Sequence, residues 1–273
     1  MSIDVAPALF GLLVGFLVGL TGVGGGSLMT PFLVAVVGVP APTAVGTDLV
    51  YATVTKLTGS VQHYRQRSVN LEVALFLGLG SIPAGLLGVV TLEYMERILD
   101  AEMLKSVMIN IIAATLVLVG ASLIFREYFM PRRTEDSGDG PSKRNTWSGI
   151  GPMTRRRRMY TVIFGAMGGY LVGLTSIGSG SIMAIILLLL YPIAPAIVVG
   201  TDIAHATILS LVVGLAHMTQ GNVDFALAGT LLLGSIPGVL VGARLAPFIP
   251  GKPLKTILAV MLIFVGVRLL LTY

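Results

Sequence analysis

The sequence predicts an all-α polytopic membrane protein made of two inverted-topology repeats, each with about five hydrophobic segments and with broken or short helices at glycine-rich motifs. Three observations support this prediction. Hydrophobic residues make up 55% of the 273-residue chain and charged residues only 11%, whereas an ordinary soluble domain is about 25% charged. About ten apolar segments follow one another along the chain, and the second half repeats the first.

Most of the apolar segments are long enough to cross a bilayer, whose hydrocarbon core takes roughly 20 helical residues. They lie near residues 5–21, 44–63, 71–92, 104–125, 160–175, 197–218, 225–243 and 255–272. Segments 27–39 and 181–193 are shorter, because thirteen helical residues rise only about 20 Å. Each is expected to form a short or half helix paired with the segment before it, with a break at the run of glycines between them.

The repeat is visible without a gap. A shift of 154 places aligns residues 15–88 with 169–242, and 30 of these 74 positions are identical. The matches cluster in four motifs: LVGLT at 17–21 and 171–175, GGGSLM and GSGSIM beginning at 24 and 178, VGTD at 45–48 and 199–202, and GSIP at 80–83 and 234–237. The proline of GSIP is expected to bend its helix, because proline removes a backbone hydrogen bond.

Charged loops predict the orientation of the two repeats. Basic residues mark cytoplasmic loops, which places 64–69, 126–158 and 244–255 inside, and 93–102, 218–223 and the C-terminus outside. An odd number of crossings per repeat then gives the halves opposite orientations. The predicted organisation is a first transmembrane repeat at 1–125, a basic cytoplasmic linker at 126–159 and a second transmembrane repeat at 160–273.

Charge and cysteine content exclude several other classes. The net charge is +5, but nine of the 18 Lys and Arg residues lie between Arg126 and Arg158, which favours a cytoplasmic loop over a nucleic-acid surface. The chain has no cysteine, so it has no disulfide framework and no Cys metal site. The three histidines lie on separate segments or at segment ends, and no catalytic constellation has useful spacing. We therefore expect no enzyme activity, no cofactor and no metal.

The glycine-rich breaks suit a small anion. Glycine allows close backbone approach, and the N-terminus of the helix that follows presents free N–H groups and a positive dipole end. Hydroxyl groups in and around the breaks add donors. The predicted substrate-binding residues are Thr21, Gly24, Gly25, Gly26, Ser27, Thr47, Thr175, Gly178, Ser179, Gly180, Ser181 and Thr201. The alternative is that the glycines only allow close helix packing.

Two acids stand inside apolar segments at equivalent positions, Asp48 and Asp202. An intramembrane carboxylate is costly and is a functional candidate. Either the pair carries a coupling proton or binds sodium, or each acid caps its glycine break. His205 follows Asp202 on the same helix face and could be its proton partner, or it could be a core histidine. Lys56 could attract an anion, or it could extend toward the membrane interface.

The motif GLTGVGGGSLMTP, its second copy GLTSIGSGSIM, and the paired VGTD and GSIP elements resemble the sulfite exporter TauE/SafE family of membrane permeases over nearly the whole chain. The second copy departs from the pattern at Ser179 and Ile185, which replace Gly25 and Pro31. The resemblance implies a bacterial or archaeal inner-membrane permease for small sulfur-containing anions such as sulfite, thiosulfate or organosulfonates. With the inverted repeats, we expect it to export such an anion by alternating access. Its expected partners are the lipid bilayer and the small anion. An uncoupled anion channel on the same fold and an intramembrane enzyme are the alternatives.

Overall fold

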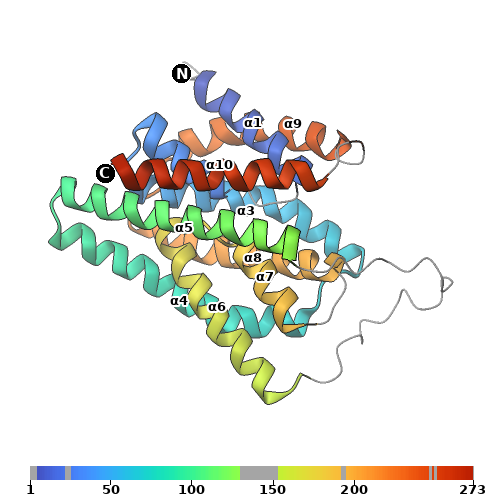
Figure 1. Cartoon of the computed structure of the whole chain (residues 1–273). Helices are drawn as coiled ribbons and strands as arrows, with labels where there is room; N and C mark the ends of the chain where they lie inside the picture. Colours follow the sequence, from blue (N-terminus) through green and yellow to red (C-terminus); the bar gives the residue numbers. More distant parts are fainter. Residues whose placement is uncertain are drawn as a thin grey trace.

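The computed structural model describes residues 5–21, 26–129, 153–191, 195–245, 248 and 251–272. Within these residues the chain forms helices and no strand (Figure 1). The helices are α1 (Val5–Thr21), α2 (Gly26–Phe32), the π-helix η1 (Leu33–Val37), α3 (Ala41–Arg65), α4 (Leu71–Ile98), α5 (Ala101–Phe129), α6 (Arg155–Thr175), α7 (Ser181–Leu190), α8 (Pro195–Thr219), α9 (Phe225–Leu245) and α10 (Gly251–Thr272). Each predicted apolar segment corresponds to one helix or, for 27–39, to α2 continued by η1.

Five helices of the described part are long and apolar enough to cross a membrane, and they belong to α4, α5, α8, α9 and α10. Many large apolar side chains on the outer faces are exposed, among them Leu79, Leu233 and Phe264. Exposed apolar surface on this scale faces lipid in a membrane protein. The predicted fold class, an all-α polytopic membrane protein, is confirmed.

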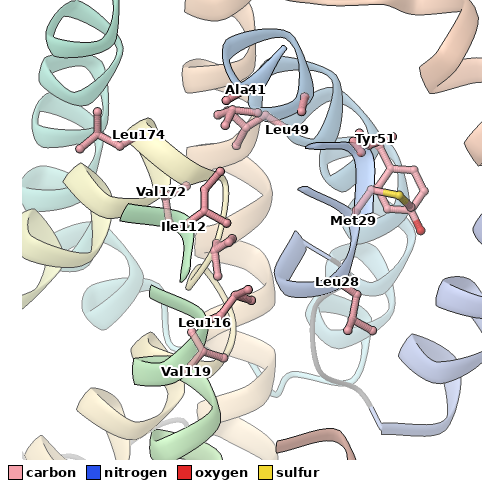
Figure 2. Close-up of a cluster of buried hydrophobic side chains, with 14 of the residues drawn as sticks. Leu28, Met29, Ala41, Leu49, Tyr51, Ile112, Leu116, Val119, Val172 and Leu174 are labelled. Carbon is pink, nitrogen blue, oxygen red and sulfur yellow. The ribbon is translucent and has the colours of Figure 1, made fainter. Parts of the chain in front are cut away.

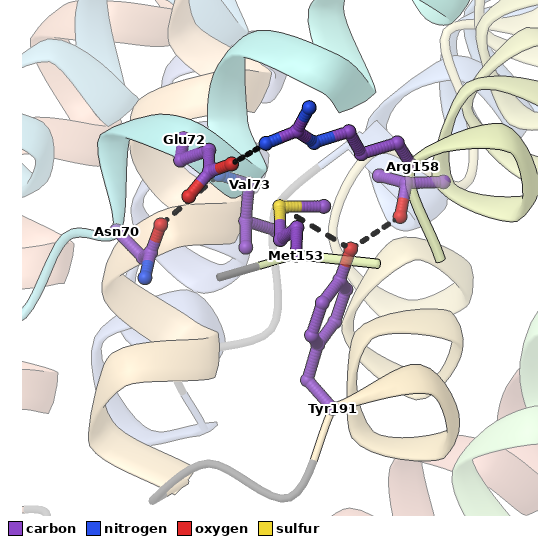
Figure 3. A network of polar contacts seen from close by, with 7 residues as sticks. Asn70, Glu72, Val73, Met153, Arg158 and Tyr191 are labelled. Carbon is purple, nitrogen blue, oxygen red and sulfur yellow. Dashed lines mark hydrogen bonds and ion pairs between the residues drawn. The ribbon is translucent and has the colours of Figure 1, made fainter. Parts of the chain in front are cut away.

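The short helices fold back on the helices before them, as predicted. At the C-terminal end of α7, the Tyr191 hydroxyl lies 2.5 Å from Oγ1 of Thr161 near the start of α6 (Figure 3). Helices α6 and α7 therefore form a hairpin whose tip is residues 176–180. In the first half, the rings of Phe10 on α1 and Phe32 on α2 are stacked.

Helices of the first half pack mainly against helices of the second: α1 on α9, α6 on α4, α3 on α8, and α5 on α10. The α1–α9 and α6–α4 contacts depend on glycine. A Cβ atom at Gly169 of α6 would collide with the Ser81 backbone of α4, and one at Gly15 of α1 would collide with the Ser235 backbone of α9. The 154-residue shift relates Gly15 to Gly169 and Ser81 to Ser235, so the α1–α9 and α6–α4 contacts are equivalent under the sequence repeat.

The main hydrophobic core lies between helices of both halves of the chain (Figure 2). It joins Met29 of α2, Leu49 of α3, Ile112 and Leu116 of α5, and Val172 of α6, each of which is almost fully buried. The α6–α7 hairpin and the α2–α3 segment therefore meet inside the protein. This packing places polar side chains of α3 close to the tip of the hairpin.

Candidate functional site

A lysine and a serine meet at the tip of the α6–α7 hairpin. Nζ of Lys56 on α3 donates a hydrogen bond to Oγ of Ser179, at 2.6 Å. Ser179 is buried, and the turn that holds it is sharp: Gly178 has a φ of 103°, which favours glycine over any residue with a side chain. The turn thus brings a buried hydroxyl group to a partly buried ammonium group from the other half of the chain.

Two buried carboxyl groups attract this lysine electrostatically. Asp48 of α3 and Asp202 of α8 are both buried, and the charges of both attract Lys56. In each carboxyl group, Oδ1 has no hydrogen-bond partner among the described residues. The predicted acids and the predicted lysine therefore belong to one electrostatic cluster.

The two acids have different surroundings. Oγ1 of Thr30 on α2 donates to Oδ2 of Asp48, at 2.6 Å. The residue equivalent to Thr30 in the second half is Ala184, which has no donor. Asp202 instead interacts with Lys56 and with Arg126 of α5. Asp48 is thus hydrogen-bonded to the short helix beside the first glycine break, while Asp202 lies in the electrostatic field of two cations.

His205 does not pair with Asp202. Its Nε2 atom lies 2.7 Å from Oγ of Ser81 on α4, and its Nδ1 atom has no partner among the described residues. In the other half, the hydroxyl of Tyr51 lies 2.5 Å from Oγ of Ser235 on α9. Tyr51 and His205 occupy equivalent positions of the two halves, and each is within hydrogen-bond distance of the serine of the GSIP motif in the opposite half.

Thr47 and Thr201 each bind a loop of the opposite half of the chain. Oγ1 of Thr47 accepts a hydrogen bond from the backbone N–H of Asp224, and Oγ1 of Thr201 accepts one from the N–H of Asn70, at 3.0 and 2.9 Å. Both threonines are fully buried. Each therefore fixes the loop that precedes a long helix of the other half.

The remaining predicted residues divide into three groups. Thr175, at the end of α6, donates from Oγ1 to the Leu171 carbonyl and accepts from the Ile177 N–H, so it closes the helix. Gly180 caps α7 and Ser181 is its first residue, while Thr21 ends α1, Gly26 begins α2, and Ser27 is buried in the first turn of α2. Gly24 and Gly25 lie outside the described residues.

Sequence reasoning did not identify Thr30, Ser81 or Ser235 as partners of the candidate residues. Ser81 and Ser235 could have been found, because both stand in an identical motif of the two halves. The proline of the motif predicts a bend, and helices α4 and α9 continue through Pro83 and Pro237. The repeat does not single out Thr30, because the equivalent residue of the second half is Ala184.

Comparisons with known proteins agree with this architecture. The profile of the family described as "Sulfite exporter TauE/SafE" matches residues 8–269. A "Probable membrane transporter protein YjnA" of Bacillus subtilis is 40% identical over 267 residues, which cover 98% of this chain and all of that protein. A second protein of that organism, "Probable membrane transporter protein YdhB", is 25% identical over 94% of this chain and 96% of its own length. No solved structure matches significantly. The chain belongs to the sulfite exporter TauE/SafE family of membrane transporters.

Proposed function

We propose that this membrane transporter exports a small sulfur-containing anion, such as sulfite, thiosulfate or an organosulfonate, by alternating access between two inverted repeats. The family description supports the substrate class. The cross-packing of the two halves and the contacts related by the 154-residue shift support the repeat arrangement. The substrate site we propose is the tip of the α6–α7 hairpin together with the first glycine break.

The hydrogen bond from Lys56 to Ser179 carries this proposal. An ammonium group inside a membrane protein is costly unless it is paired, and here its hydrogen-bond partner is only a neutral hydroxyl. An oxyanion that approached the hairpin tip would accept a stronger, charge-assisted hydrogen bond from Lys56. It would also accept a bond from the Ser179 hydroxyl. Lys56 and Ser179 would therefore exchange their mutual bond for bonds to the substrate.

The acids supply the coupling in this proposal. Asp48 and Asp202 oppose the binding of an anion beside Lys56, because like charges repel at short range in a medium of low dielectric constant. A proton or a sodium ion on one carboxyl group would remove part of this repulsion. We assign that role to Asp202, because Asp48 already accepts a bond from Thr30. Substrate and coupling cation would then bind together.

The test is transport by purified protein in liposomes loaded with sulfite. We expect Lys56→Gln to lose most of the efflux, Lys56→Arg to keep part of it, and Ser179→Ala to weaken apparent affinity. Ser210→Ala is the matched control, because Ser210 is the buried equivalent of Lys56 on α8. Normal efflux by Lys56→Gln would overturn the proposed site.

A planar-bilayer recording separates the transporter from the uncoupled channel. A channel would pass a steady anion current in the absence of a gradient of the coupling cation. A coupled transporter would move sulfite only as fast as its conformational cycle allows, and a pH or sodium gradient would drive accumulation. Steady single-channel current would favour the channel.

A further inference from the structure

A cavity of about 600 Å³ lies between α4 and α8. Its α4 wall is a single stripe with helical spacing that runs from Leu71 through Leu75 and Leu79 to Pro83, and its α8 wall is His205 and Ile208. This stripe covers thirteen residues, and its ends are about 18 Å apart along the helix axis. The cavity is therefore an elongated apolar groove along more than half of the hydrocarbon core.

The groove opens toward the membrane. Leu75, Leu79 and Ile208 are 60%, 56% and 54% exposed, although they line the cavity. Gly78 contributes to the space, because a Cβ atom added there would meet only the end of Ile82, at 3.7 Å. In the second half the equivalent position holds Leu232. The groove thus has the length, the apolar wall and the lateral opening that a lipid acyl chain requires.

Positively charged residues lie beside the start of α4, at one end of the groove. Helices α4 and α6 run side by side in the same direction, because Gly165 meets Leu77 and Gly173 meets Gly85. The first turn of α6, with its four arginines at 155–158, therefore lies beside the start of α4. Nη2 of Arg158 lies 3.0 Å from a carboxylate oxygen of Glu72 (Figure 3). The guanidinium group of Arg158 also lies over the ring of Phe76.

The end of α3 and the loop before α4 add further cations at the same end. Arg65 and Arg67 are exposed and precede Leu71, the first residue of the groove, by only a few positions. Glu72 offsets one positive charge through its pair with Arg158. The end of the groove remains basic, and arginine forms paired hydrogen bonds with phosphate oxygens.

We infer that the α4–α8 groove binds an anionic phospholipid, with one acyl chain between Leu71 and Pro83 and the phosphate beside Arg67 and Arg158. The acyl chain covers the leucine stripe, and the guanidinium groups select a negatively charged headgroup. This lipid site is separate from the residues proposed to bind the transported anion. Its experimental test therefore does not depend on which anion the protein transports.

Native mass spectrometry of the purified full-length protein tests the site. We expect dioleoyl phosphatidylglycerol to bind with a defined stoichiometry and dioleoyl phosphatidylcholine to bind at least roughly tenfold more weakly. The reason is that each arginine at the membrane surface strengthens the electrostatic attraction to a headgroup that carries a net negative charge. Gly78→Leu should abolish the selective binding by filling the groove. Gly229→Leu on α9 is the matched control, since a Cβ atom there meets nothing within 4 Å. The double variant Arg67→Gln/Arg158→Gln should bind both lipids equally.

Fluorescence quenching gives a second measurement that does not depend on the fold of Gly78→Leu. The one tryptophan of the chain, Trp147, is replaced by phenylalanine, and Ile208→Trp places a new fluorophore in the groove wall. Brominated phosphatidylglycerol should quench it more strongly than brominated phosphatidylcholine at equal mole fraction. Equal quenching by the two lipids, or selective binding that persists in Gly78→Leu, would overturn the site.

Discussion

Nε2 of His205 on α8 lies 2.7 Å from Oγ of Ser81 on α4, so a buried hydrogen bond joins the second half of the protein to the first. The repeat-equivalent pair is Tyr51 and Ser235, whose oxygen atoms lie 2.5 Å apart. The imidazole of His205 and the phenol of Tyr51 differ in chemistry, yet each contacts the serine of the GSIP motif in the other half. Identical serines are thus retained for cross-half contacts while their partners have diverged.

We expect Ser81→Ala and Ser235→Ala each to destabilise the protein by about 1–3 kcal/mol, because each leaves a buried polar group without a partner. Ser122→Ala is the control and should cost less, since that hydroxyl bonds only to a carbonyl of its own helix. The measurement is unfolding of purified protein in detergent. In a double-mutant cycle, adding Ser235→Ala to Tyr51→Phe should cost little. Fully additive losses would contradict a direct bond.

We expect close packing of α6 on α4 to depend on Gly169. A methyl group there would collide with the Ser81 backbone, so Gly169→Ala must push the helices apart, at a cost of about 1–3 kcal/mol. Gly229→Ala meets no atom within 4 Å and should instead gain up to about 1 kcal/mol from helix propensity. Thermal unfolding in detergent measures both. A Gly169→Ala protein as stable as Gly229→Ala would mean that the two helices can separate freely.

The sequence predicted the helices well, because each apolar segment is bounded by glycine, proline or charge and can be identified locally. Segment 181–193 became α7, Ser181–Leu190, paired with α6 as expected. The partners within the site could not be predicted in the same way. His205 and Asp202 share a helix face, but the packing of α4 on α8 brings Ser81 to His205. Contacts between distant helices depend on tertiary packing, which local spacing does not encode.

Inverted orientation predicts opposite accessibility for two glutamines at equivalent positions, Gln66 and Gln220. The chain has no cysteine, so single substitutions can be labelled without background. In intact cells, an impermeant thiol reagent should modify Gln220→Cys and leave Gln66→Cys unmodified. Glu96→Cys is the control for the outer side, because Glu96 is exposed and lies in the predicted outer loop. Labelling of both glutamine positions from outside would show that the halves have the same orientation.

The last prediction separates the two acids. Asp48 accepts a bond from Thr30, while Asp202 has Ala184 in place of that threonine and interacts with Lys56 and Arg126. We therefore expect Asp48→Asn to lower the stability of the α2–α3 region, and Thr30→Ala to reproduce this loss with transport coupling retained. Asp202→Asn should leave a stable protein in which substrate flux no longer responds to a gradient of the coupling cation.

Two measurements test these expectations. Unfolding in detergent gives the stability of each variant. Sulfite efflux and proton flux, recorded together in liposomes that contain either sodium or potassium, give the coupling. The asymmetry predicts that only Asp202→Asn uncouples the fluxes, because the Thr30 hydroxyl already stabilises the negative charge of Asp48 and no threonine does so for Asp202. Equal loss of coupling in the two asparagine variants, or coupling that persists in Asp202→Asn, would show that the missing threonine does not determine which acid binds the cation.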